Sequence, residues 1–223
     1  MNLGKRIELH THSLLSDGEL TPSEMLRRAE ALGYEAIAIT DHVDASNLES
    51  VVKSIVRLSE EVRNSTETEL IPGVELTHVH PKDIDRLAKD ARKLGATLII
   101  VHGETPIEPV GSGTNFSAVS STEVDILAHP GFITVKEGEL ARENGIYLEL
   151  SSRRGHCLTN GHVAQVALET STRLLVNTDL HSPGDFITQE MAYRVARGAG
   201  LRDDEALKVV RDNPQQLLKK IRV

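Results

Sequence analysis

A chain of 223 residues with 39% hydrophobic and 26% charged residues can bury a substantial core, as one large domain or two small ones. Aromatic residues make up only 3% and tryptophan is absent, so a stacking platform for single-stranded nucleic acid is hard to build. The formal charge of −8 also argues against a broad phosphate-tracking surface, although bound cations would make the surface less negative.

Short apolar runs alternate with longer amphipathic stretches along the whole chain. From the N-terminus, strands are predicted at 7–12, 35–42, 69–76, 96–103, 124–131, 145–152 and 173–181. Helices are predicted at 21–33, 45–64, 81–95, 115–122, 135–144, 160–171 and 188–199, with one or two more from 203 to 220. Thr21, followed by Pro22 and Glu24, suits a helix start. Gly33 and Gly95 suit helix ends.

Nearly all-apolar strands separated by helices predict an α/β fold with a parallel sheet buried on both faces. Seven such units without a break in composition predict one closed barrel and a single domain, residues 1–223. An open doubly wound sheet is the alternative, but no glycine-rich turn follows the first strand. The loop 103–116 is the most irregular segment, and is either a mobile edge of a site or a plain connection.

Targeting signals and disulfides are not predicted. The opening residues, MNLGKRIELH, have no apolar signal-peptide core, and no later run approaches transmembrane length. Cys157 is the single cysteine, so no intramolecular disulfide can form. We therefore expect no membrane partner and a reducing cytoplasm as the compartment.

Residue types that bind metals recur where the predicted strands end. His10 and His12 are two residues apart in the first strand, so they point to one side, although a lone H-x-H is also common on surfaces. The ends of later strands carry His42, Glu75, His102, His129, Asp179 and His181. In a barrel all strands end at one rim, where barrel enzymes keep their chemistry. The sequence therefore predicts a metal centre at this rim.

The motifs around these residues resemble those of the PHP (polymerase and histidinol phosphatase) family. The matching segments are His10, His12 and Asp17 in H-x-H-x4-D, Thr40 to His42 in T-D-H, Pro72 to Glu75 in P-G-V-E, His102, His129 in A-H-P-G, and Asn177 to His181 in N-T-D-x-H. The resemblance covers residues 7–183 and implies a distorted (β/α)7 TIM-like barrel. Many relatives have histidine where this chain has Asp17, which leaves the metal at that position open.

The resemblance further implies a trinuclear site of nine ligand positions. One metal would be bound by His10, His12, Glu75 and Asp179. A second would be bound by Glu75, His102 and His129. A third would be bound by Asp17, His42 and His181. Glu75, Asp179 and His181 are then the expected catalytic residues. Imidazole and carboxylate ligands without thiolates suit Zn²⁺, Mn²⁺ or Fe²⁺ in a catalytic site. Adjacent metals activate water and hold a phosphate group.

Two arginines follow the sixth strand on the expected catalytic rim. Arg153 or Arg154 is expected to bind phosphate, since a guanidinium can contact two phosphate oxygens; a solvated loop pair is the alternative. Asp41 either orients a ligand histidine or caps a turn.

The remaining histidines do not lie at strand ends. His78 and His80 are expected to be surface loop residues, with substrate contact as the alternative. His156 and His162 are expected to be surface or capping residues. Cys157 adjoins His156, but a thiol protease is not indicated because no separate orienting acid is apparent.

These features together predict a metal-dependent hydrolase, a phosphoesterase acting on a small phosphomonoester in the manner of a histidinol phosphatase. A nuclease acting on oligonucleotides is the nearest alternative, and nucleic acid is disfavoured as a partner. An amidohydrolase also opens with H-x-H on a barrel, but typically carries a bridging lysine where this chain has His102. A non-catalytic barrel subunit of the ribonuclease P type resembles the family with its metal residues eroded, whereas all nine positions are filled here.

Overall fold

The computed structural model describes residues 2–222, in which eight parallel strand segments form the centre of the fold. The segments are β1 (Ile7–Glu8), β2 (Ala36–Ile39), β3 (His42–Val43), β4 (Glu69–Leu76), β5 (Leu98–His102), β6 (Ile126–Ala128), β7 (Tyr147–Ser151) and β8 (Leu174–Asn177). Their order is β1-β2-β4-β5-β6-β7-β8, with β3 paired to β4. Both β2 and β3 pair with β4 in the same register, so β2 and β3 are two parts of one interrupted strand. The eight segments therefore form a sheet of seven strands.

The sheet nearly closes between β8 and β1, though not through a regular ladder. A single parallel bridge joins Thr11 and Leu180, and the amide of His12 donates to the Leu180 carbonyl over 2.7 Å. The Arg6 guanidinium donates to the Val176 carbonyl over 2.8 Å. The predicted distorted barrel of seven units is therefore confirmed. The first and last strands are shorter than the predicted 7–12 and 173–181, because single contacts replace continuous pairing at this seam.

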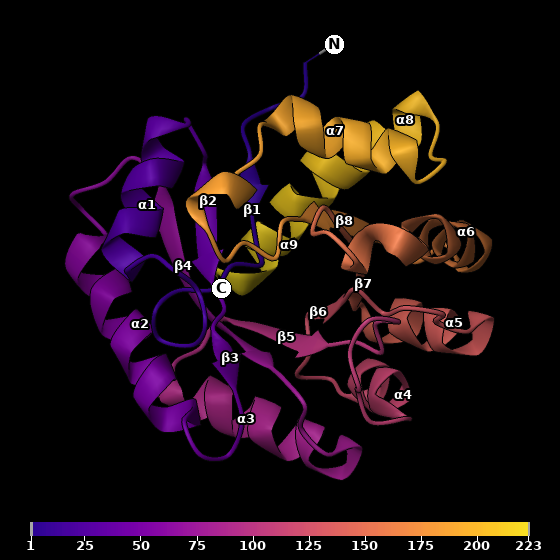
Figure 1. Ribbon diagram of the computed structural model, residues 1–223, viewed down its shortest axis with the longest axis horizontal. Helices are drawn as coiled ribbons and strands as arrows, with labels where there is room; N and C mark the ends of the chain where they lie inside the picture. Colours follow the sequence, from indigo (N-terminus) through magenta and orange to yellow (C-terminus); the bar gives the residue numbers. More distant parts are fainter. Residues whose placement is uncertain (1, 223) are drawn as a thin grey trace.

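Helices surround the strands and follow one another around the outside of the barrel (Figure 1). They are α1 (Pro22–Ala31), α2 (Leu48–Val62), α3 (Ile84–Leu94), α4 (Thr114–Ser120), α5 (Val135–Asn144), α6 (Asn160–Thr170), α7 (Gln189–Gly198), α8 (Asp203–Leu207) and α9 (Asn213–Ile221). Short 3₁₀ turns lie at Pro81–Asp83, His156–Thr159 and Pro183–Asp185, and a π-helical turn at Lys208–Asp212 joins α8 to α9. The predicted helices are thus all present, with ends that differ by a few residues.

The predicted helix ends have the expected chemistry. The Thr21 side chain accepts a hydrogen bond from the amide of Glu24, which satisfies one of the free donors in the first turn of α1. Gly95 ends α3 with a φ of 108°, a left-handed conformation that glycine adopts without a steric penalty.

Apolar side chains pack on both faces of the strands, which explains their nearly continuous hydrophobic sequences. Inside the barrel, residues such as Ile7, Leu98 and Ile126 contact one another, and Leu217 and Leu218 of α9 belong to the same cluster. Helix α9 therefore covers the end of the barrel at which the strands begin. The opposite end, where the strands finish, remains available for a site.

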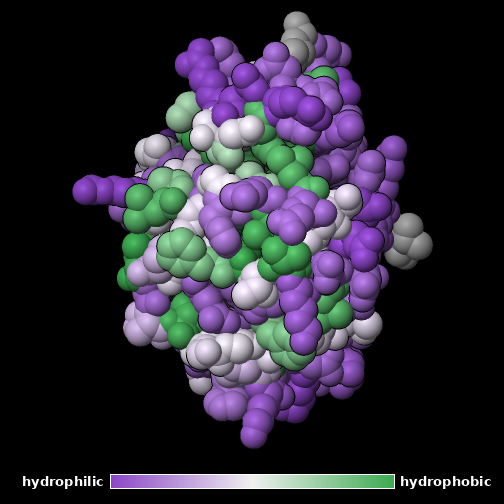
Figure 2. Space-filling model, turned by 90° about the vertical axis from the view of Figure 1, so that its right-hand side faces the viewer, coloured by the Kyte–Doolittle hydropathy of each residue, from purple (hydrophilic) through white to green (hydrophobic). Residues whose placement is uncertain are grey.

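The outer surface is mixed in character. From the side that shows α4 to α8, apolar residues are interspersed with polar ones (Figure 2). Within residues 2–222, none of the helices combines the length and the apolar character that a bilayer crossing requires.

Candidate metal centre

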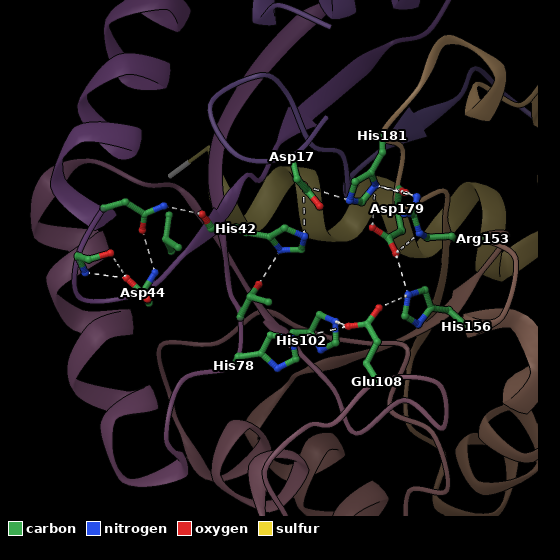
Figure 3. Close-up of a pocket in the computed structure, with 14 residues that line it drawn as sticks. Asp17, His42, Asp44, His78, His102, Glu108, Arg153, His156, Asp179 and His181 are labelled. Carbon is green, nitrogen blue, oxygen red and sulfur yellow. Dashed lines mark hydrogen bonds and ion pairs between the residues drawn. The ribbon is translucent and has the colours of Figure 1, made fainter. Parts of the chain in front are cut away.

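All nine predicted ligand side chains lie at the C-terminal rim of the barrel. His10 and His12 follow β1, Asp17 lies in the turn after them, His42 is in β3, Glu75 in β4, and His102 ends β5, while His129 follows β6 and Asp179 and His181 follow β8. Figure 3 shows several of these side chains pointing into a common pocket, with His181, Asp179 and Arg153 together on one side and Asp44 on the other.

The turn after His12 carries Asp17 to the rim. The Asp41 carboxylate fixes it by accepting hydrogen bonds from the Ser13 amide over 2.7 Å and the Ser16 hydroxyl over 2.6 Å. A side chain on Gly18 would meet the His12 carbonyl oxygen at 2.1 Å, so this close turn requires glycine. Asp41 thus holds the turn in place, and its hydrogen bonds go to serines of that turn instead of to a ligand histidine.

Glu75 occupies the middle of the cluster and is fully buried. Its Oε1 lies 3.2 Å from His10 Nε2 and 3.6 Å from His129 Nε2, and its Oε2 lies 2.6 Å from His42 Nδ1. The glycine of the P-G-V-E motif permits this position, because a Cβ on Gly73 would lie 2.8 Å from Thr40 Cγ2 of the neighbouring chain segment. Glu75 therefore faces side chains of all three predicted metal sites.

Asp179 presents its two carboxylate oxygens to different neighbours. Oδ1 lies 3.1 Å from His12 Nε2, whereas Oδ2 lies 3.8 Å from His129 Nε2. Both Asp179 (φ 52°) and His129 (φ 26°) have positive φ values, which are uncommon for residues other than glycine. Such strain persists where the surrounding structure imposes it, and often marks functional sites.

Several buried polar atoms of the cluster make no hydrogen bond in the described chain. They are Nε2 of His10, both ring nitrogens of His12 and of His129, and Oε1 of Glu75. Burying polar atoms without partners costs free energy, so a set of buried imidazole nitrogens and carboxylate oxygens suits divalent cations. The donor set therefore fits the metals that the sequence predicts.

Among residues 2–222, side chains that can share a metal fall into groups whose ligand atoms lie within 4.8 Å of one another. Three groups match the three predicted sites closely: His10, His12 and Asp179; Glu75, His102 and His129; and Asp17, His42 and His181 together with His12. The third group is the most open, because Asp17 is 57% exposed while Glu75 is fully buried.

Burial and neighbouring charges shift the pKa values of the cluster in different directions. Burial raises the pKa of Glu75, but the surrounding His10, His42 and His102 hold it well below its ordinary value. Burial lowers the pKa of His10, yet the nearby carboxylates of Glu149, Glu75 and Asp179 raise it well above its ordinary value. Burial and the neighbouring His42 lower the pKa of His12 to about 3, which keeps that ring neutral and able to ligate.

Two acidic residues of the site were not predicted from the sequence. Glu149 in β7 is fully buried; its Oε2 lies 2.8 Å from His10 Nδ1 and accepts a hydrogen bond from Asn177, so it orients His10. Glu108 comes from the irregular loop 103–116, and its Oε2 lies 3.0 Å from His102 Nε2. The hydrogen bond to His102 lowers the pKa of the Glu108 carboxyl group. The loop thus forms an edge of the pocket. A glutamate inside an apolar strand was the available signal for Glu149.

The prediction that His156 is a surface or capping residue is wrong. Its side chain is only 3% exposed, because the loop 103–116 packs over it and places the Thr105 hydroxyl 2.8 Å from its Nδ1. Its ring stacks on His129 with the centroids 4.1 Å apart. Burial and the neighbouring His129 lower its pKa to about 4. His162, by contrast, lies outside the pocket lining, with Nε2 2.7 Å from the Ile133 carbonyl.

The two arginines after β7 have different surroundings. Arg153 lines the pocket, donates to the Asp179 carbonyl over 3.0 Å and lies 2.8 Å from His181 Nδ1. Arg154 is exposed and does not line the pocket. His78 does line it, although its side chain is 48% exposed, and the exposed His80 caps the turn Pro81–Asp83.

The pocket has a volume of about 430 Å³. This volume lies within the range of small-molecule sites, about 300–1,000 Å³. Its lining combines histidines and carboxylates with a single arginine, Arg153.

Comparison with known sequences gives several relatives. The family model for the PHP domain matches residues 8–112. An uncharacterized protein of Methanocaldococcus jannaschii is 48% identical over 217 residues, which cover 97% of this chain and 100% of that protein. Ribonuclease P protein component 3 of Methanosarcina barkeri is 28% identical, over 92% of this chain and 86% of that protein. A probable phosphatase of Thermoanaerobacter sp. is 26% identical, over 90% of this chain and 89% of its own length.

Solved structures resemble the fold at low sequence identity. A chain in archaeal ribonuclease P with mature tRNA superposes with a TM-score of 0.71 at 15% identity, over 96% of this chain and 89% of that chain. Histidinol phosphate phosphatase from Lactococcus lactis, complexed with zinc, L-histidinol and phosphate, superposes with a TM-score of 0.59 at 15% identity, over 89% of this chain and 95% of that chain.

Proposed function

Because the chain belongs to the PHP domain family of metal-dependent hydrolases, we propose that it hydrolyses a small phosphomonoester with the help of about three divalent metal ions. The observation that carries this proposal is the set of nine metal-competent side chains at one rim, several with buried atoms that make no hydrogen bond to any other part of residues 2–222. Zn²⁺, Mn²⁺ and Fe²⁺ suit this mixture of imidazoles and carboxylates.

In this proposal the nine side chains hold three metals, and Glu75 is shared by two of them. His10, His12, Glu75 and Asp179 would hold one metal, Glu75, His102 and His129 the second, and Asp17, His42 and His181 the third. Bound metals would supply an activated water and neutralise charge on the phosphoryl group and the leaving oxygen. Glu75, Asp179 and His181 are the catalytic residues in this proposal, and Glu149 orients His10 through its Nδ1.

Arg153 binds phosphate in this proposal, since it is the arginine that lines the pocket. A guanidinium there would attract the phosphate group locally, in a chain whose formal charge of −8 otherwise repels it. The pocket of about 430 Å³ accommodates a small ester. A polymer would need neighbouring sites for its bases, and aromatic residues make up only 3% of the sequence.

A barrel subunit of a ribonucleoprotein is the second candidate. It is favoured by the TM-score of 0.71 to a chain of archaeal ribonuclease P, against 0.59 for the histidinol phosphate phosphatase. The filled ligand positions weigh against it, because a purely structural subunit has no need for buried, unpaired ligand atoms.

Turnover measurements on the metal-loaded protein distinguish these functions. The substrates are a panel of sugar, amino-alcohol and nucleoside monophosphates, together with diesters and short oligonucleotides. We expect the highest kcat/KM for a small monoester, and loss of that activity in a Glu75→Gln variant prepared in parallel. Faster cleavage of oligonucleotides than of every monoester would overturn the proposal in favour of a nuclease. No turnover of any ester, together with specific RNA binding, would favour the subunit.

A further inference from the structure

His156 is a pocket residue that the nine predicted ligands leave without a role. Its Nε2 lies 3.4 Å from Glu108 Oε1 and 3.6 Å from Asp179 Oδ2. Figure 3 shows its ring pointing toward both carboxylates from the side of the pocket that Arg153 occupies. Two residues of the same loop after β7, Arg153 and His156, therefore reach the same oxygen of Asp179.

The ring of His156 is held in one orientation. Its Nδ1 lies 2.8 Å from the Thr105 hydroxyl, and its face stacks on the ring of His129. Nε2 faces carboxylate oxygens of Glu108 and Asp179, which accept hydrogen bonds, so we place the ring proton on Nε2 and let Nδ1 accept from the Thr105 hydroxyl. A histidine that accepts a hydrogen bond at Nδ1 carries its own proton on Nε2, so Nε2 is a donor aimed into the pocket.

The two carboxylate oxygens of Asp179 have different neighbours. On the Oδ1 side lies His12, whose ring nitrogens make no hydrogen bond within residues 2–222 and are suited to a metal. On the Oδ2 side lie His129 at 3.8 Å, the Arg153 guanidinium, with Nε at 3.5 Å, and Nε2 of His156 at 3.6 Å. His156, His129 and Asp179 also lie close enough to share a cation. A fixed positive charge disfavours a metal on the Oδ2 side and favours an anion.

We propose that His156 is a phosphate-binding residue, which donates from Nε2 to a phosphoryl oxygen while Arg153 donates to another. This proposal rests on the proposed phosphoesterase function and adds a second donor to its substrate site. Thr105 acts as a positioning residue, because its hydroxyl sets the orientation of the ring and its protonated nitrogen. Arg153 and His156 then bind the phosphate from the segment after β7, on the Oδ2 side of Asp179.

Two substitutions of similar polarity separate the role of Nε2 from that of Nδ1. His156→Gln places an amide nitrogen near the position of Nε2, whereas His156→Asn reaches only as far as Nδ1. Thr105→Val removes the hydroxyl group and leaves the histidine. His162→Gln is the matched control, since His162 follows on the same segment but does not line the pocket.

The affinity of the metal-loaded protein for inorganic phosphate is measured by calorimetry, with metal content determined on the same samples. We expect His156→Asn to weaken phosphate binding about tenfold or more, and His156→Gln to stay within about threefold of the original chain, the difference reflecting one lost hydrogen bond. Thr105→Val should weaken binding by an intermediate factor. All variants should retain the original number of metals.

Three outcomes would overturn this role for His156. Equal phosphate affinity in the Asn variant and the original chain would show that His156 does not contact phosphate. A failure of the original chain to bind phosphate would contradict the proposed contact as well. Loss of about one metal equivalent in the Asn variant would show that His156 is a metal ligand instead.

Hydrolysis assays on the same variants separate this proposal from the proposed function. If phosphate binding follows the expected order but no ester is hydrolysed, the phosphoesterase function fails while the phosphate contact stands. If esters are hydrolysed and the order is absent, the contact alone fails.

Discussion

Carboxylates are buried at both ends of the barrel, but the chain supplies them with different hydrogen-bond and ion-pair partners. Before β6, at the end where the strands begin, Asp125 is 2% exposed; it accepts hydrogen bonds from the Ile99 amide over 3.0 Å and from Lys220 over 3.2 Å, and pairs with Arg92. At the other end, Glu75 is fully buried, and within residues 2–222 its Oε2 accepts a hydrogen bond from the Thr77 hydroxyl over 3.0 Å while its Oε1 accepts none. Buried carboxylates at the two ends therefore differ in how completely the chain pairs them.

This difference indicates which end stabilises the fold and which end binds a ligand. An ionised carboxylate removed from water costs several kcal/mol unless charges and hydrogen bonds compensate it. At the Asp125 end the chain supplies Arg92 and Lys220 itself. At the Glu75 end the neighbours are imidazoles, which carry a full positive charge only when protonated. Compensation at the rim therefore depends on protons taken up by the imidazoles or on cations bound from outside the chain.

The largest effect should come from removing a central ligand. In His10→Ala and Glu75→Ala variants, we expect activity to fall by several orders of magnitude while the fold is retained, because barrel stability comes from the buried strands and helices. Phosphatase assays and far-UV circular dichroism measure the two properties. An unfolded variant would show that the rim is structural, and the contrast between the ends would be lost.

A smaller effect is expected at the phosphate contact. Arg153→Ala should raise the activation free energy for kcat/KM by about 1.5–3 kcal/mol, the range for a lost charge-assisted hydrogen bond. Arg154→Ala is the matched control, because Arg154 is exposed outside the pocket lining. Steady-state kinetics on a monoester compare the two. Unchanged kcat/KM in the Arg153 variant, or an equal loss in both, would contradict this assignment.

At the opposite end, substitution should affect stability and leave catalysis intact. Asp125→Ala leaves the buried Ile99 amide without its side-chain partner, so the free energy of unfolding should fall by about 1–3 kcal/mol. Urea denaturation of the metal-loaded protein measures this change, and kcat/KM below the transition should match that of the original chain. A loss of kcat/KM without a loss of stability would reverse the roles that we assign to the two ends.

The last prediction concerns pH. Neighbouring carboxylates raise the pKa of His10, His42 and His102 against the lowering effect of burial. Protons bound to these three histidines stabilise the metal-free fold. This stabilisation is fully present at pH values below the ordinary pKa of histidine, and it is lost as the pH rises through the raised pKa values. A metal must displace the protons, so metal affinity should fall by up to about tenfold per pH unit for each displaced proton as pH is lowered. Metal titrations at two pH values, in buffers of different ionisation enthalpy, test this; equal affinity and no proton release would refute it.

The fold and the convergence of metal-competent side chains at one rim were predictable because both follow from local patterns. Apolar runs mark strands that are buried on both faces, and parallel strands bring residues at their ends to one rim. His42, Glu75 and His102 each end or nearly end a strand, so their convergence follows from topology alone.

The residues that escaped prediction depend on how a loop folds. His156 and Glu108 meet at the pocket only because the segment 103–116 packs against the turn after β7, a tertiary contact without a periodic signal. The first and last strands were predicted too long, since nothing local in 7–12 or 173–181 shows that Arg6 and Thr11 make single contacts at the seam between β1 and β8.

The claim that this rim is completed by cations is tested most directly by the metal content of the protein. Elemental analysis should be made on the chain purified without chelator and freed of loosely bound ions. We predict about three equivalents of divalent metal per chain, since nine ligands at about three each fill three sites. One equivalent or less, with His42 and His181 uncoordinated in the structure of that sample, would contradict the trinuclear centre.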